Sequence, residues 1–511
     1  MQIEYGQIIL NKPLCSLSRM YRSRPKDNLE PEGLNFMTSL KLDNEIVEYD
    51  ILGTQAHVIM LHEENLLTLG SLKKILTVLI FLRRNPKKLE EWGYEDIHEA
   101  LETYLVKKLG IEVGGRIQTG RSRNDQVILD VCMKARDDLN SISSSLITLI
   151  NHMIKKAEEN LDSVMPLYTH LQQAQIGNLA HYFLSYSEQL LRDLGRLSSS
   201  YISINKSPLG SGPVGGSTVH INRKRTASLL GFGGLVTNSI DATSSRDNLL
   251  ELMSALCILM LTLSRVAEDI IIWSTQEFGF MEIADKFAST SSAMPHKKNP
   301  DPLELIRSKA TLVAGNLMTA ITLLKGLPSG YSRDLQDLKA VFLNSMSITR
   351  SSLTIIDAII KSLIIDKRRL RKSVVNSYAF SIDVAEQLVA KKGLPFRTAH
   401  KLSGSLVKLA IKKDMIPLSG LDRDQIQQVL DELSANIEVE DLIKILSDLT
   451  PEKSILLRST VGSPNPIKQK LEIRSLKVRA QKYGEKIDRR KEYLAAALEK
   501  LEKVTTSYIN N

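Results

Sequence analysis

Five long stretches of this chain contain almost no glycine or proline and repeat their apolar residues at helical spacing. They are residues 127–160, 172–204, 246–273, 302–325 and 334–365. Each is longer than an ordinary globular helix. Within one of them, residues 255–261 (A-L-C-I-L-M-L) are apolar all the way round, which requires burial on every side. We therefore expect an all-α, mainly helical fold built on a long central five-helix bundle that other subunits help to cover.

The remaining patterns predict three domains. Residues 1–120 combine short helix-like runs with glycine and proline, and residues 121–371 hold the bundle. Residues 372–511 return to shorter helices before a basic helical tail. The most apolar helix contains Arg265 and Glu268, so we expect it to be buried in the protein rather than to span a membrane.

The net charge of +9 does not indicate a nucleic-acid-binding protein. From residue 465 to the end there are twelve Lys or Arg against six Asp or Glu, so this tail carries +6 of the total. A basic amphipathic helix is usually a solvated face, and no nucleic-acid recognition motif accompanies the charge. The three cysteines are scattered singly, and no secretory signal is visible. These features predict a cytoplasmic protein without disulfides or a zinc site.

One segment between two of the long helices carries an unusual set of side chains. Residues 289–304 read S-T-S-S-A-M-P-H-K-K-N-P-D-P-L-E, in which three prolines and four hydroxyl residues predict an exposed loop. The loop combines proton-transfer groups with fixed positive charge, which suits reactions of anionic substrates. At its end, Asp301 as N-cap, Pro302 and Glu304 also fit an acidic capping box, a purely structural role for Glu304.

A second motif stands before the first long helix. Residues 119–127 (T-G-R-S-R-N-D-Q-V) place Arg121 and Arg123 among hydrogen-bonding side chains at the helix entrance. Helix N-termini favour anions, and arginine adds bidentate recognition of carboxylates. Capping of the helix by Asn124 or Asp125 is the simpler interpretation, but it leaves the paired arginines unexplained.

Two further segments carry polar side chains next to long helices. Residues 168–172 (Y-T-H-L-Q) place His170 before a long helix, so we expect it at a helix entrance rather than in the core. Residues 331–339 (Y-S-R-D-L-Q-D-L-K) open the last long helix. By contrast, residues 210–215 (G-S-G-P-V-G) contain the spacing G-x-G-x-x-G without a preceding strand, and they do not indicate a dinucleotide site.

Together these segments resemble the argininosuccinate lyase family of the fumarase/aspartase superfamily, from about residue 36 to residue 464. Residues 289–304 are similar to the superfamily's signature loop, and T-G-R-S-R-N-D-Q-V and T-H-L-Q match motifs of the family. The resemblance implies a homotetramer whose active sites draw residues from different subunits. It also implies β-elimination of argininosuccinate to arginine and fumarate, with no metal and no organic cofactor.

The resemblance assigns roles to individual residues. Ser291 is the proposed base, and Lys297 stabilises the dianionic aci-carboxylate that proton removal creates. His170, oriented by Glu304, assists the guanidino leaving group. The matching substrate-binding residues are Ser39, Arg123, Asn124, Thr169, Arg246, Asn299, Tyr331, Gln336 and Lys339.

The chain departs from the family pattern in the signature loop. Thr290 stands where the family usually has glycine, and His296 stands where argininosuccinate lyases usually have glutamine. M-P-H-K is closer to the loop of adenylosuccinate lyase, which remains the alternative enzyme. A catalytically silent structural homologue, like the lens crystallins, is the alternative of a different class. The retained Ser291, Lys297 and His170 favour an enzyme.

Overall fold

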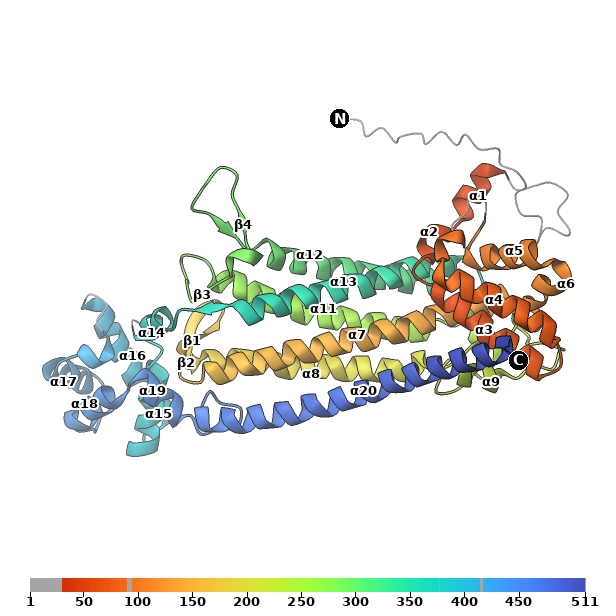
Figure 1. The fold of residues 1–511 in the computed structure, drawn as a ribbon. Coiled ribbons are helices and arrows are strands. Elements are labelled where there is room, and N and C mark those ends of the chain that lie inside the picture. Colours follow the sequence, from red (N-terminus) through yellow and green to blue (C-terminus); the bar gives the residue numbers. More distant parts are fainter. Residues whose placement is uncertain (1–29, 90–93, 376, 414–416, 511) are drawn as a thin grey trace.

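Five long helices form the centre of the protein (Figure 1). The computed structural model describes residues 30–89, 94–375, 377–413 and 417–510. The central helices are α7 (Arg123–Glu159), α8 (Leu179–Ile204), α11 (Asp247–Trp273), α12 (Asp301–Leu324) and α13 (Asp334–Ser362). α7 packs on α8 and α13, α11 packs on α8 and α12, and α12 packs on α13, so the five helices close into one bundle. The expected mainly helical fold and five-helix bundle are confirmed.

The helix expected to begin at residue 172 begins later. Residues Gln172–Asn178 form strand β2, which pairs with β1 (Val164–Thr169) as an antiparallel hairpin, and α8 follows directly. Asn178 caps α8, because its side chain accepts a hydrogen bond from the backbone N–H of His181. A Cβ at Gly177 would lie 2.6 Å from Leu167 Cδ2, so the hairpin depends on this close approach.

The N-terminal helices pack against one end of the bundle and share its hydrophobic core. They are α1 (Pro31–Met37), α2 (Leu40–Asp43), α3 (Val47–Glu63), α4 (Leu69–Arg84), α5 (Ile97–Leu109) and α6 (Ile111–Gly114), with the 3₁₀ turns η1 (Pro86–Leu89) and η2 (Gly115–Gln118). α3 is buried over most of its length, because α4, α5 and α7 all pack against it. This end of the bundle therefore has a rigid backing of helices.

Short elements connect the bundle helices. Two small helices, α9 (Arg223–Leu229) and α10 (Ser239–Ser244), lie between α8 and α11. The connection from α11 to α12 contains β3 (Met281–Glu282), η3 (Asp285–Phe287), β4 (Ser289–Thr290) and β5 (Lys298–Asn299). β4 pairs with β5, and β3 pairs with β6 (Ile364–Ile365), which follows α13. The far end of α13 is thus tied to the segment that leads into residues 289–304.

The C-terminal part has two components. Beyond the bundle, a separate hydrophobic cluster is formed by α15 (Ser381–Lys392), α16 (Phe396–Lys412), η4 (Leu418–Gly420), α17 (Arg423–Glu432) and α18 (Val439–Asp448). The helices α14 (Lys367–Val375) and α19 (Pro451–Leu457) instead place Val374 and Ile455 in a smaller cluster with Val164 and Ile176 of the β1–β2 hairpin. The basic tail is α20 (Pro466–Asn510), which packs along α7 and α8 instead of staying with the small helices. The division of the chain into three domains at residues 120 and 371 remains a prediction. The position of α20 beside the bundle shows that the tail of the predicted C-terminal domain contacts the predicted central domain.

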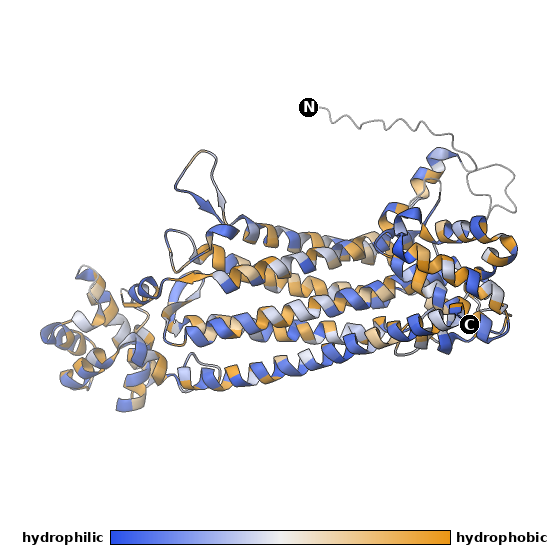
Figure 2. Ribbon diagram, in the orientation of Figure 1, coloured by the Kyte–Doolittle hydropathy of each residue, from blue (hydrophilic) through white to orange (hydrophobic). Residues whose placement is uncertain are grey.

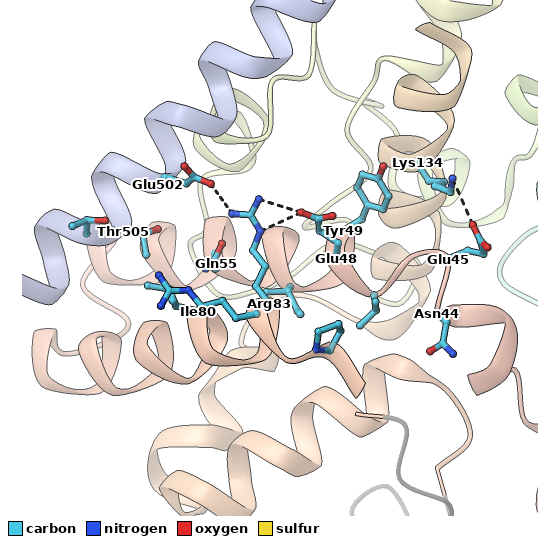
Figure 3. Close-up of a pocket in the computed structure, with 15 residues that line it drawn as sticks. Asn44, Glu45, Glu48, Tyr49, Gln55, Ile80, Arg83, Lys134, Glu502 and Thr505 are labelled. Carbon is cyan, nitrogen blue, oxygen red and sulfur yellow. Dashed lines mark hydrogen bonds and ion pairs between the residues drawn. The ribbon is translucent and has the colours of Figure 1, made fainter. Parts of the chain in front are cut away.

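The end of α20 is tied to the N-terminal helices by ion pairs. Arg83 on α4 donates to Glu48 on α3 and to Glu502 on α20, at 3.1 Å and 2.7 Å (Figure 3). These side chains line a cavity of about 750 Å³ whose wall also includes Tyr49 of α3 and Lys134 of α7. Because none of the predicted site residues lines it, this cavity is not the predicted active site.

The bundle leaves apolar side chains uncovered on α11 and α12. Leu256 and Leu259 are fully buried, but Ile258 and Leu261 are 40% and 52% exposed. Figure 2 shows hydrophobic residues recurring along α12 and α13 as well. Among the described residues, α11 is the one helix long and apolar enough to cross a membrane, yet 61% of its most apolar stretch is buried inside the bundle. The apolar pattern of residues 255–261 requires burial on every side, and a single chain does not provide it.

Candidate active site

The motif at residues 119–127 forms a tight turn and a helix N-terminus. α7 begins at Arg123, earlier than expected, because Ser122 is its N-cap and forms a capping box with Asp125. Asp125 also accepts a hydrogen bond from the backbone N–H of Gly212 at 2.7 Å, so the glycine-rich segment braces this helix end. Asn124 points toward the same segment and donates to the carbonyl of Pro213 at 3.0 Å. Asn124 and Asp125 are thus not the N-cap.

Side chains of α3 hold this turn from behind. His57 donates from Nε2 to the carbonyl of Thr119 at 2.9 Å, and Arg121 donates to Thr54 Oγ1 at 3.0 Å. Burial, together with the charge of Arg121, lowers the pKa of His57 to about 3, so its ring is neutral. Gly120 has φ +72°, and a Cβ there would lie 2.6 Å from Ile221. The turn is therefore fixed before any ligand arrives.

Ser39 and Lys339, far apart in the sequence, meet at a buried carboxylate that the sequence did not single out. Ser39 Oγ donates to Asp43 at 2.8 Å, Lys339 Nζ forms an ion pair with Asp43, and the backbone N–H of Ile97 donates to it at 3.2 Å. Both Lys339 and Asp43 are almost fully buried. Asp43 lies on α2, where its only sequence signal was its spacing of four residues from Ser39.

Arg123 is already paired with carboxylates in this structure. Its Nη1 donates to Glu95 at 3.0 Å and its Nε lies 3.3 Å from Asp96. Glu95 also accepts a hydrogen bond from Arg333, which stands beside Tyr331 at the start of α13. These two arginines hold the pKa of Glu95 below its usual range, although burial opposes them. An anionic ligand bound next to Arg123 and Arg333 would compete with Glu95 for their guanidinium groups.

Two other predicted substrate contacts lie at the same end. Gln336 donates to the carbonyl of Met37 at 3.0 Å, and burial raises the pKa of Tyr331. Arg246, expected to bind a carboxylate, is buried at the start of α11. Its Nη1 donates to the carbonyls of Thr243 and Ser245, whereas its buried Nη2 has no hydrogen-bond partner among the described residues.

His170 lies at the tip of the β1–β2 hairpin, and the predicted position at a helix entrance is wrong. Thr169 pairs with Gln172 across the hairpin, which leaves His170 and Leu171 as the two turn residues. Both have positive φ, at 55° and 57°, which a two-residue hairpin turn of type I′ requires at both central positions. His170 is exposed at this tip.

Residues 289–300 form an exposed loop closed at its base by β4 and β5, whereas residues 301–304 of the predicted loop are the first turn of α12. The hydroxyl oxygen of Ser291 accepts hydrogen bonds from the backbone N–H groups of Ala293 and Met294, at 3.2 Å and 3.0 Å. Two N–H groups directed at one oxygen favour negative charge on it. Lys297 is exposed, whereas Lys298 lies 2.7 Å from both Glu282 and Asp285. The loop thus holds one lysine that the described carboxylates leave unpaired, beside a hydroxyl set among N–H donors.

The predicted capping box at the end of this loop is wrong. Pro300 occupies the N-cap position of α12, and no side chain caps the helix there. Asp301 instead accepts a hydrogen bond from Ser289 Oγ at 2.5 Å, which closes the loop base next to Asn299. Glu304 is exposed on the first turn of α12 and is therefore available to another group.

The structure brings the predicted residues together in two groups at opposite ends of the bundle (Figure 1). α13 runs from Asp334, near Lys339 and Asp43, to Ser362, next to β6 and β3. A helix of 29 residues at 1.5 Å per residue is about 43 Å long. The hairpin with His170 and the loop with Ser291 lie at the far end. One chain therefore cannot bring all predicted residues to one substrate molecule.

Comparison with known proteins assigns the chain to a family. A family model described as "Lyase" matches residues 34–315, and a model described as "Argininosuccinate lyase C-terminal" matches residues 378–455. The argininosuccinate lyase of Nitrosopumilus maritimus is 41% identical over 484 residues, which cover 95% of this chain and 99% of that one. This chain belongs to the argininosuccinate lyase family. The family member from Methanocaldococcus jannaschii is 38% identical over 91% of this chain and 95% of its own length.

Solved structures support the fold of this argininosuccinate lyase family member. A variant of EDDS lyase with bound fumarate has a TM-score of 0.83 and 28% sequence identity, and covers 94% of this chain and 95% of that one. A class II fumarase from Schistosoma mansoni has a TM-score of 0.68 at 16% identity, covers 81% of this chain and 91% of that one, and shows the shared fold. The family is one of carbon–nitrogen lyases, and the chain is an enzyme of that class.

Proposed function

We propose that this protein cleaves argininosuccinate to arginine and fumarate by β-elimination. The observation that carries the proposal is the 41% identity to a curated argininosuccinate lyase over nearly the full length of both chains. A structural neighbour holds fumarate, the product that such an elimination releases. The match of residues 378–455 to an argininosuccinate lyase C-terminal model supports this substrate over adenylosuccinate.

In this proposal Ser291 removes the proton next to the substrate carboxylate. That proton is weakly acidic, so the reaction needs a strong base and a pocket that stabilises the dianionic aci-carboxylate. The backbone N–H groups that point at Ser291 Oγ make a serine alkoxide less unfavourable. Lys297 and Asn299, on the same loop, provide positive charge and a donor for the aci-carboxylate. Closure of this exposed loop over the substrate would exclude water from the reacting atoms.

The leaving group and the rest of the substrate are held by other elements. His170, oriented by Glu304, protonates or positions the guanidino nitrogen. The contacts that remain from the sequence prediction are Ser39, Arg123, Asn124, Thr169, Tyr331, Gln336 and Lys339. The pairing of Ser39 and Lys339 through Asp43 supports their action as one group. Arg246 also remains in this set, because its buried Nη2 has no hydrogen-bond partner among the described residues.

We also propose a cytoplasmic homotetramer with active sites built from several chains. Two observations support shared sites. The predicted residues lie at the two ends of a bundle about 43 Å long. Apolar side chains on α11 and α12 stay exposed, among them Leu261, Leu305, Leu312 and Met318. Exposed apolar surface of this kind, with residues from both ends required at one site, favours packing of bundles against one another.

The test is to incubate the purified protein with argininosuccinate and, separately, with adenylosuccinate, and to follow fumarate by its ultraviolet absorbance. We expect fumarate from argininosuccinate alone. Release from adenylosuccinate alone would replace the proposed substrate with the alternative. No release from either substrate by folded protein would favour a catalytically silent homologue.

A further inference from the structure

A buried histidine joins three helices directly behind the turn at residues 119–125. His98 on α5 lies with Nδ1 3.1 Å from Asp50 Oδ1 on α3 and 3.7 Å from Asp130 Oδ2 on α7. The three side chains are between 0% and 2% exposed. Through this ring, the polar cluster links α5 to both α3 and α7. None of the three residues has a role in the proposed chemistry.

The charges around this cluster favour a protonated ring. The carboxyl groups that face His98 are Asp50 on α3, Asp96 before α5 and Asp130 on α7, and the neighbouring Arg121 is faced in addition by Glu102 on α5 and Asp125 on α7. The neighbouring cations are Arg121 and Lys339, and Lys339 is already paired with Asp43. Two buried carboxylates cannot both stay ionised without a nearby cation. Burial and the charge of Asp50 raise the pKa of Asp130 well above its usual range, and an imidazolium between Asp50 and Asp130 opposes that shift by supplying the cation.

Two further observations agree with this assignment. Burial lowers the pKa of His98, but Asp50, Asp96 and Asp130 outweigh burial and raise it to about 9. Neither oxygen of Asp130 has a hydrogen-bond partner among the described residues, so the ring is its nearest compensating group.

We propose that His98 is a positioning residue whose imidazolium clamps α3, α5 and α7 together and thereby sets the place of the substrate-binding turn. The connections to that turn are direct. Asp50 Oδ1 accepts a hydrogen bond from Gln126 on the first turns of α7 at 3.2 Å. Arg121, within the turn, faces the same carboxylates and donates to Thr54 on α3. A shift of α3 against α7 would therefore move Arg123 and Asn124.

The same three residues could also hold a divalent cation, because their ligand atoms lie within 4.8 Å of one another. A guanidinium facing the same carboxylates and a ring nitrogen at hydrogen-bond distance from Asp50 favour a proton over a metal ion. The metal is therefore an outcome that the test must distinguish.

The test uses four variants of the full-length protein and rests on the proposed turnover of argininosuccinate. His98→Gln keeps a polar group but removes the charge, and Asp130→Asn removes one carboxylate. The double variant removes both charges together. His152→Gln is the matched control, because His152 pairs with Asp357 at 2.7 Å and links α7 to α13 away from the turn.

We expect His98→Gln to raise the KM for argininosuccinate at least tenfold with kcat within threefold of wild type, and the double variant to bring KM back within threefold. A purely structural loss would lower the active fraction, so that kcat falls and KM stays unchanged, and the two substitutions would then add. The control should leave both constants within twofold. An unchanged KM in folded His98→Gln, or no recovery in the double variant, would overturn the proposal.

Two measurements keep the outcome clear if His98→Gln does not fold. Asp130→Asn alone should move the alkaline loss of stability to lower pH, since it removes one carboxylate that keeps the ring charged. Elemental analysis of the wild-type protein should find no stoichiometric divalent metal. One bound metal per chain that Asp130→Asn removes would refute the imidazolium clamp. Wild-type protein that releases no fumarate would contradict the proposed function instead, and the pH and metal measurements would still decide this inference.

Discussion

If the active site is shared, two inactive variants should restore each other's activity in mixed tetramers. The perturbation is His170→Ala in one preparation and Ser291→Ala in another, unfolded together in equal amounts and refolded. Both residues lie in exposed turns or loops at the same end of one chain, so neither substitution should disturb the core. The predicted contacts Ser39, Asn124 and Lys339 lie near the other end of α13, a helix about 43 Å long, which is a distance no side chain spans.

The expected magnitude follows from random assembly. If His170 and Ser291 at one site come from different chains, each position is wild-type with a probability of about one half, so about a quarter of the sites are fully wild-type. Activity should therefore recover to about 25% of a refolded wild-type control, measured as fumarate release. If both residues came from one chain, every site would carry one defect and mixing would restore nothing.

A second mixture tests independently whether His170 and Ser291 at one site come from different chains. The double variant His170→Ala with Ser291→Ala, refolded with an equal amount of wild-type protein, should retain about a quarter of wild-type activity when the residues come from different chains, and about half when they come from one chain. Zero recovery in the first mixture together with half activity in the second would refute the shared site. The family assignment would be unaffected.

Other predictions concern single chains. Ser291→Ala should lower kcat about a thousandfold, within the range for a general base, with an unchanged melting curve. Lys297→Met should be comparably damaging, but Lys298→Met milder because Lys298 is paired with loop carboxylates; equal kcat losses would contradict this assignment. Because the pKa of His98 is raised to about 9, its contribution to stability should be complete below about pH 6.5 and lost as the pH rises through 9, seen as a falling melting temperature absent from His98→Gln. Phe342→Ala, in the core of α13, should reduce the free energy of unfolding by about 3–5 kcal/mol in urea titrations.

The sequence predicted the bundle well because helical periodicity acts over long windows. Residues 127–160 and 334–365 carry an apolar stripe over many turns, and the corresponding helices follow them closely. The β1–β2 hairpin was missed because the alternation of polar and apolar side chains in residues 172–178 covers only residues 173–176, the shortest run that indicates a strand. The hairpin depends instead on the packing of Leu167 against Gly177, a contact that no local pattern records.

The candidate site was predicted unevenly for a similar reason. Asn124 stands in the first turn of α7, and His170 and Ser291 stand in a hairpin turn and a loop, where polar side chains in an unusual order attract attention. Asp43 and His98 lie on helices, where the sequence does not distinguish a single functional polar residue from the polar residues of a solvent-exposed helix face. Their importance arises only when three or four elements pack together and leave their charges without water.

The geometry of the bundle also limits how chains can assemble into a shared site. The end that carries Ser39, Asn124 and Lys339 must meet the end that carries His170 or Ser291 from another chain. Two bundles packed in parallel would place like ends together and leave the two groups about 43 Å apart. Antiparallel packing through α11 and α12 brings unlike ends together and covers the apolar side chains exposed along those helices. In the proposed assembly, the surface that covers residues 255–261 would also complete the active site, so a chain that cannot assemble should lose activity even if its own fold is intact.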